Sequence, residues 1–168
     1  MTSLKTRGFY YKIYTFLPII FLFISVLNEF NFNYLNLDYF SFNFPFILIF
    51  FFTLKESKNF DYLLVFFAGL INDTVVGLPL GISSLSYVLI CIATSYFRNI
   101  TIRPDQLKDW FYFLFIISLI NSINYSILTL FFSFNLILMD YLVNTFFTFL
   151  FYIIFVYGFK YYLKGLDD

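Results

Sequence analysis

The sequence predicts an all-α membrane protein, a bundle of six transmembrane helices with a break rich in glycine and proline between the third and the fourth helix. Two observations of composition lead to this class. Of the 168 residues, 61% are hydrophobic and only 12% are charged, whereas soluble domains have about 25% charged residues. The mean hydropathy is +0.85. The third observation is the distribution of lysine and arginine, which decides how many helices cross the membrane.

The first predicted span covers residues 13–28 and follows a short basic segment. This order resembles a signal peptide, but no small-residue cleavage site follows the apolar run, so we expect an uncleaved first helix. The second span, residues 39–54, is the weakest, because an asparagine and a proline interrupt it. Both spans are near the lower length limit for crossing a bilayer.

The third and fourth predicted spans cover residues 60–76 and 81–97, and the fifth and sixth cover residues 110–132 and 136–159. The last two are long enough to cross about 30 Å of hydrocarbon at 1.5 Å per residue. The first four are shorter, so we expect them to tilt little or to cross a thinned bilayer. No soluble domain, repeat or flexible linker is evident, and residues 1–168 are predicted to form a single membrane domain.

The basic residues decide whether the weak second span crosses. With six crossings and both termini inside, all ten Lys and Arg residues fall on the cytoplasmic side. Without the second crossing, three would lie inside and seven outside. Because cytoplasmic loops of membrane proteins carry an excess of Lys and Arg, we predict six crossings with cytoplasmic N- and C-termini.

The break between the third and fourth spans contains one acid and a helix-breaking sequence. A carboxylate in a bilayer segment costs roughly 3 kcal/mol on insertion scales, so Asp73 needs a structural or functional reason. Proline lacks an amide donor and glycine tolerates positive φ, so Gly77-x-Pro79-x-Gly81 cannot continue a helix. We predict that the third helix stops at Asp73, that a turn covers residues 77–80, and that a new helix starts near Gly81.

Two interpretations of Asp73 are open, and they overlap. It is either a helix-terminal residue in the outer interface that caps the amides before Gly81, or it holds a re-entrant backbone by accepting from the amides of residues 77–81. Non-helical backbone at membrane depth needs such partners. A structural role is favoured in both, because a lone acid provides no catalytic pair.

Polar side chains recur at helical spacing on the last three spans, and we expect these stripes to point inward. They are Ser83, Tyr87, Cys91, Thr94 and Arg98 in the fourth span, Ser118, Ser122, Tyr125 and Thr129 with Asn121 and Asn124 alongside in the fifth, and Tyr141, Thr145, Thr148 and Tyr152 with nearby Asn144 in the sixth. They form either hydrogen bonds between helices or a polar cavity for a small solute. The first is favoured, because no second buried charge joins Asp73.

The sequence indicates neither an enzyme nor a nucleic-acid-binding protein. It has no His and a single cysteine, Cys91, which excludes a Cys/His metal cluster and a disulfide within the chain. No nucleophile–base arrangement, phosphate-binding loop or basic stripe is present. We therefore expect no catalytic residue, no metal and no cofactor.

Seven residues of the break carry a resemblance to a known family. They form the pattern Gly69-x-x-x-Asp73-x-x-x-Gly77-x-Pro79-Leu80-Gly81-x-x-x-Leu85. Placed between the third and fourth of six spans in a chain of this length, the pattern resembles the rod shape-determining protein MreD family. Length and topology agree over the whole chain, but motif-level specificity is confined to residues 69–85. The chain is richer in Phe, Asn and Tyr than the usual family pattern.

The resemblance implies a non-enzymatic, multi-pass subunit of the bacterial cytoplasmic (inner) membrane. It implies a function in the cell-elongation (rod) complex, where the protein would help to maintain cell shape and to organise peptidoglycan synthesis. The implied direct partner is MreC, with MreB and the peptidoglycan synthases as indirect partners. The seven pattern residues would then be a structural or partner-binding motif.

MreD proteins are also similar in fold to the S components of energy-coupling-factor transporters. This similarity supplies the alternative function, a solute (vitamin)-binding membrane subunit. Such a subunit is expected to gather Trp, His, Arg or Glu at the outer ends of its helices. Here the outer ends are poor in these residues and the only tryptophan, Trp110, is predicted at the cytoplasmic side, which favours the assembly subunit.

Overall fold

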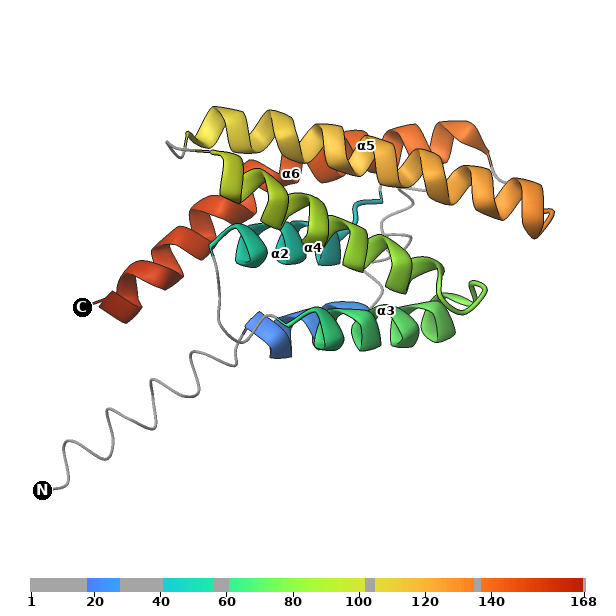
Figure 1. Cartoon of the computed structure of the whole chain (residues 1–168), viewed down its shortest axis with the longest axis horizontal. Coiled ribbons are helices and arrows are strands. Elements are labelled where there is room, and N and C mark those ends of the chain that lie inside the picture. Colours follow the sequence, from blue (N-terminus) through green and yellow to red (C-terminus); the bar gives the residue numbers. More distant parts are fainter. Residues whose placement is uncertain (1–17, 28–40, 56–60, 102–104, 135–136, 168) are drawn as a thin grey trace, which may run out of the picture.

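The computed structural model describes residues 18–27, 41–55, 61–101, 105–134 and 137–167, with side chains up to residue 161. These residues form six helices and no strand. The helices are Pro18–Leu27, α2 (Phe44–Leu54), α3 (Tyr62–Val76), α4 (Ile82–Ile100), α5 (Gln106–Phe131) and α6 (Leu138–Asp167). Figure 1 shows them as one bundle. The predicted all-α class is confirmed.

The predicted spans match these helices in order, and the third span ends at residue 76 as its bounds predict, but other boundaries differ. α3 does not stop at Asp73 and continues to Val76, because the Asp73 carbonyl still accepts from the N–H groups of Gly77 and Leu78. α4 extends to Ile100 and α6 to Asp167. The basic N-terminal segment and the first five residues of the predicted first span lie outside the described residues.

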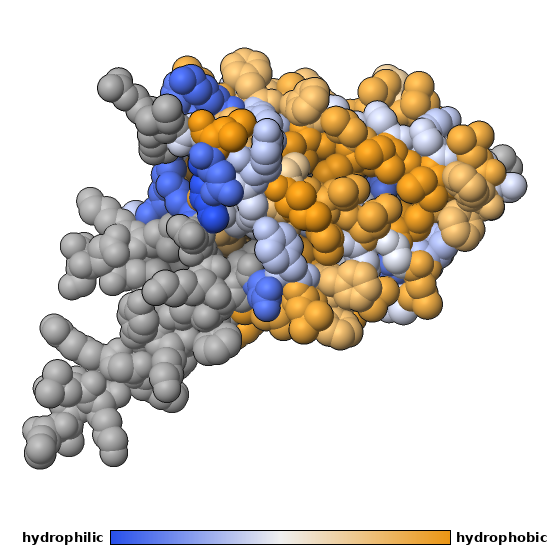
Figure 2. Space-filling model, in the orientation of Figure 1, coloured by the Kyte–Doolittle hydropathy of each residue, from blue (hydrophilic) through white to orange (hydrophobic). Residues whose placement is uncertain are grey.

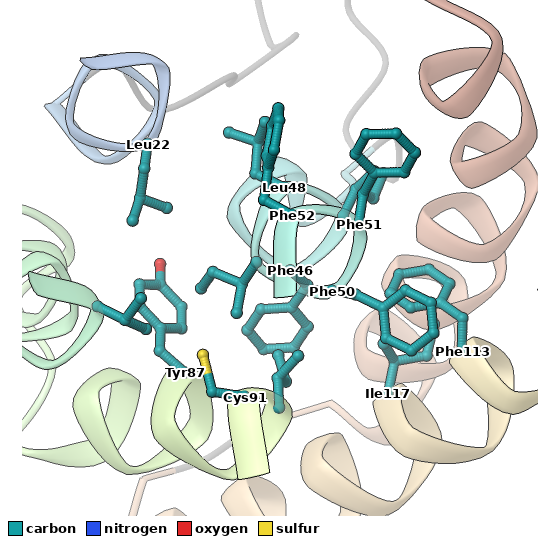
Figure 3. Packing of buried hydrophobic residues seen from close by; sticks show 14 of the residues in the cluster. Leu22, Phe46, Leu48, Phe50, Phe51, Phe52, Tyr87, Cys91, Phe113 and Ile117 are labelled. Atoms are coloured by element: carbon teal, nitrogen blue, oxygen red, sulfur yellow. The ribbon is translucent and has the colours of Figure 1, made fainter. Parts of the chain in front are cut away.

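α2 lies at the centre of the apolar core. Nine consecutive residues, 45–53, are buried, because α2 packs against both α4 and α6. A helix that is apolar on every side belongs in a protein interior or in lipid. Figure 3 shows the rings of Phe46 and Phe50 pointing toward α4 and toward Phe113 of α5. The proline that weakened the span prediction, Pro45, lies in the first turn, where its missing donor costs little.

α5 and α6 are the membrane-spanning candidates by length and composition. Gln106–Phe131 and Leu138–Tyr161 are long and apolar enough to cross a membrane. Only 33% and 17% of their most apolar windows are buried, so they expose apolar side chains rather than forming a soluble core. The helix Pro18–Leu27, α2 and α3 are apolar but shorter than the about 20 residues of a typical span. Six crossings therefore stay a prediction.

One end of the bundle is hydrophilic. Figure 2 shows hydrophilic residues gathered at the end where α5 begins, and a largely hydrophobic surface along the rest of this face. At that end Arg98 donates to the carbonyl of Thr53 at 3.0 Å, and Lys160 donates to Gln106 at 2.9 Å. The α3–α4 turn lies at the opposite end (Figure 1). The described basic side chains thus have the one-sided placement that the sequence predicts.

Candidate functional site

The break between α3 and α4 is built on two glycines with left-handed backbone. Gly77 ends α3 with φ 74° and ψ 27°, and Gly81 precedes α4 with φ 105° and ψ −15°. Residues with a Cβ rarely adopt positive φ, whereas glycine does so without steric cost. Pro79 lies between the two glycines, and its carbonyl accepts from the N–H of Ile82 at 3.4 Å. The predicted turn is therefore confirmed, together with its dependence on glycine.

The Asp73 carboxylate connects the end of α3 to the start of α4. Its side chain is 0% exposed, and its two oxygens accept from different amides, Oδ2 from Gly81 N–H at 2.7 Å and Oδ1 from Ser83 N–H at 2.8 Å. The first amides of a helix have no partner within the helix, and a helix N-terminus attracts negative charge. Asp73 thus caps α4 from the neighbouring helix.

This geometry settles the two interpretations of Asp73 in part. The capping role is confirmed, because the carboxylate accepts from amides at the start of α4. The placement at a helix terminus is wrong, because α3 continues for three residues beyond Asp73. The predicted donors, the amides of residues 77–81, are confirmed for Gly81, whereas the second donor, Ser83, lies beyond this range. The amides of Gly77 and Leu78 bond to the Asp73 main-chain carbonyl instead.

Gly69 and Ser84 bring the backbones of α3 and α4 into contact. A Cβ on Gly69 would lie 2.4 Å from the Ser84 Cα and 2.5 Å from its N. Small residues permit such close helix–helix approach. Beside this contact, Asn72 Nδ2 donates to Ser83 Oγ at 2.9 Å. Ser84 Oγ is buried and has no hydrogen-bond partner among the described residues, so its small size is the property that the packing uses.

The remaining pattern residues lie on the outside of this hairpin. Leu80 is exposed in the turn and Leu85 is exposed on α4. The structure therefore brings Gly69, Asp73 and the two turn glycines together with α4, and leaves the two leucines on the surface. Sequence reasoning passed over Asn72 and Ser84. Two sequence features could have indicated them: Asn72 is a polar residue one helical turn after Gly69, and Ser84 is a small residue at the start of the next helix.

The polar stripes are confirmed on two helices and wrong in part on the third. On α4, Ser83, Tyr87, Cys91 and Thr94 are buried, as are Thr148 and Tyr152 on α6. On α5, Ser118 and Ser122 are exposed. The inward face of α5 instead carries Phe113 and Ile117, which pack in the core, followed by Asn121. The apolar face of α5 packs toward α2, and the two serines therefore lie on the exposed side of the helix.

Hydrogen bonds between helices use several of these polar groups. Ser86 Oγ on α4 donates to Asn124 Oδ1 on α5 at 2.9 Å, and Asn121 Nδ2 on α5 donates to Thr145 Oγ1 on α6 at 2.7 Å. The favoured interpretation of the stripes as interhelical contacts is therefore confirmed for Asn121 with Thr145, and for Asn124, whose partner Ser86 was not among the predicted stripe residues. A cavity of about 410 Å³ lies beside them, lined by residues of all six helices.

Within the described residues, no group of three or more Cys, Asp and Glu side chains is placed to hold a metal ion. No protein-family model, curated protein or solved structure matches the chain. The candidate site is consequently defined by its own geometry, a buried carboxylate that fixes a glycine-dependent turn next to a cavity with both polar and apolar lining.

Proposed function

We propose that the protein is a multi-pass component of the bacterial inner membrane that crosses it six times, with both termini in the cytoplasm. The two long apolar helices support membrane location. The basic side chains of Arg98 and Lys160 at the hydrophilic end of the bundle support the orientation, because Lys and Arg are retained on the cytoplasmic side. Under this proposal the α3–α4 turn faces the periplasm, and the shorter helices cross a thinned bilayer.

We further propose that the protein is a non-enzymatic assembly subunit of the cell-elongation complex that binds MreC and, through it, acts with MreB and the peptidoglycan synthases. The observation that carries this proposal is the use of the Asp73 carboxylate. Both of its oxygens accept main-chain hydrogen bonds, so the charge serves the backbone of a rigid hairpin rather than an ion path or a catalytic pair. This is the behaviour expected of a scaffold.

The surface of the hairpin supports the same proposal. Leu80 and Leu85, both part of the pattern shared with the MreD family, are exposed apolar side chains. A rigid turn that fixes their positions can present them to a membrane partner. The alternative, a solute-binding transporter subunit, is favoured by one observation, the cavity of mixed polar and apolar lining beside the turn.

Depletion of the protein from a rod-shaped bacterial host tests the proposed function. We expect the cells to become round and to lyse while the uptake of vitamins stays normal. Re-expression of the wild-type chain should restore the rods, whereas Asp73→Ala should restore them incompletely. Normal cell shape together with loss of uptake of one vitamin would contradict the assembly proposal and support the transporter.

A further inference from the structure

The cavity at the end of the bundle that bears the α3–α4 turn has the size and lining of a ligand site. Its volume is about 410 Å³, within the about 300–1,000 Å³ of small-molecule pockets. It is formed where the end of the helix Pro18–Leu27, the starts of α2, α4 and α6, and the ends of α3 and α5 come together. The α3–α4 turn that Asp73 fixes forms one of its walls, with Leu78, Ile82 and Ser83 in the lining.

One tyrosine hydroxyl in this cavity makes no hydrogen bond to any described residue. Tyr87 lines the cavity and its side chain is 1% exposed. No hydrogen bond joins its hydroxyl to any described residue, and its ring makes an edge contact with Phe46. Figure 3 shows the Tyr87 oxygen pointing away from Cys91 and toward the helix that carries Leu22. The Tyr87 hydroxyl oxygen is not among the fully buried side-chain atoms that lack a partner, so it is reached by solvent and is available to a ligand.

Three asparagines in the lining use only part of their hydrogen-bonding capacity. The Nδ2 groups of Asn72 and Asn121 donate within the protein, and Oδ1 of Asn124 accepts. The opposite atoms, Oδ1 of Asn72 and Asn121 and Nδ2 of Asn124, make no hydrogen bond to any other described residue. An amide side chain provides two donors and an accepting oxygen. The lining thus offers acceptors and donors together.

The charges around the cavity disfavour an anionic ligand. No Lys or Arg is among the described residues that line it, and the single charged side chain there is Asp140. Asp140 lies in the first turn of α6, where the helix N-terminus stabilises a carboxylate without any ligand. It therefore gives no reason to expect a cation. Aromatic rings of Phe42, Phe46 and Tyr141 complete the lining with apolar surface.

We propose that this cavity binds a small uncharged molecule with several hydroxyl groups, of monosaccharide type, either as a free sugar or as the headgroup of a glycolipid. A hydroxyl group donates and accepts at once, which suits the unused asparagine oxygens, the Asn124 amino group and the Tyr87 hydroxyl. The C–H faces of such a ring can lie on the aromatic lining. This inference does not depend on the assembly function.

Binding to the full-length protein, purified in an amine-oxide detergent that carries no sugar, tests the inference. We expect at least one of glucose, galactose, mannose and ribose to bind saturably in calorimetry and to raise the unfolding temperature. Glucuronate, the anionic analogue of glucose that keeps the pyranose ring, should not bind, and glucosamine should bind no tighter than glucose. Failure of all four neutral sugars would overturn the inference, as would tighter binding of glucuronate or glucosamine.

Two glucosides distinguish a free sugar from a glycolipid headgroup as the ligand. They are methyl glucoside and octyl glucoside, and the octyl glucoside is used below its critical micelle concentration. Octyl glucoside binding at least about tenfold tighter than methyl glucoside would assign a glycolipid headgroup, because the alkyl chain then adds apolar contact. Equal affinities would assign a free sugar. Either result supports the sugar chemistry of the cavity.

A matched pair of variants locates the binding. Tyr87→Phe removes one hydroxyl that bonds to no described residue, so the unliganded protein should unfold near the wild-type temperature while the sugar binds about tenfold more weakly. Ser122→Ala, on the exposed face of α5, should leave binding unchanged. Wild-type affinity in Tyr87→Phe would refute the assignment. Lost sugar binding with normal rescue of cell shape would separate this inference from the assembly function.

Discussion

Gly69 and Asp73 lie one helical turn apart on the same face of α3, and both face the start of α4. Gly69 lets the α3 backbone approach Ser84, where a Cβ would lie 2.4 Å from the Ser84 Cα. Asp73 then lies close enough to bond the amides of Gly81 and Ser83. Close approach and capping are thus two parts of one arrangement, and loss of the first should weaken the second.

Gly69→Ala should destabilise the protein by about 1–3 kcal/mol, because the added methyl group meets backbone atoms that cannot move aside without separating α3 from α4. Thermal unfolding in detergent measures the effect. Gly158→Ala is the matched control, since a Cβ at Gly158 meets nothing within 4 Å. Equal stability of Gly69→Ala and Gly158→Ala would show that the backbones are not in contact.

Gly77→Val should destabilise the turn by about 1–3 kcal/mol through backbone strain alone. The position has φ 74° and open space around the missing Cβ, so sterics with other residues play no part. Gly77→Asn should cost less, because asparagine visits the left-handed region more readily. The yield of folded protein and its unfolding temperature give the order. A valine variant as stable as the asparagine variant would argue against the left-handed conformation.

Asp73 variants should rank in the order wild type, Asn, Ala in the stability of the hairpin. Alanine leaves the buried amide of Ser83 and the part-buried amide of Gly81 without an acceptor, and an unsatisfied buried group costs about 1–3 kcal/mol. Asparagine retains one accepting oxygen but turns its amino group toward the other amide. Unfolding in detergent measures this order. If Asn proved as damaging as Ala, the charge itself would matter beyond its two hydrogen bonds.

The sequence predicts this site well where local chemistry decides the structure. Gly77, Pro79 and Gly81 specify a turn by their backbone preferences alone, and a lone buried acid requires donors nearby. The length of α3 was harder to predict, because Asp73 uses its main-chain carbonyl to continue the helix and its side chain to start the next one. That double use depends on how the two helices pack.

Features that depend on packing between distant segments could not be predicted. Ser118 and Ser122 have helical spacing like the other polar stripes, but α5 turns Phe113 and Ile117 inward to cover α2. The contact of Gly69 with Ser84 could not be predicted either, because it depends on how α3 and α4 pack. The cavity likewise requires six helix ends to meet, and none of its asparagines is distinctive in sequence.

Single cysteines test the proposed orientation in a Cys91→Ser background. Phe134→Cys lies at the end that bears the α3–α4 turn and should react with an impermeant thiol reagent added to intact spheroplasts. Leu107→Cys lies at the hydrophilic end, in the first turn of α5, and should react after the membrane is opened. Both native side chains are exposed. Labelling of position 107 in intact spheroplasts would contradict the proposed orientation and indicate the reverse one.

Co-purification from native membranes tests the central claim most directly. The tagged protein is isolated in mild detergent, and the proteins and small molecules that accompany it are identified by mass spectrometry. The account predicts a single-pass partner with a periplasmic coiled coil, present at a reduced ratio per folded protein in Asp73→Ala. A pair of ATPases together with a tightly bound vitamin, unaffected by Asp73→Ala, would contradict it.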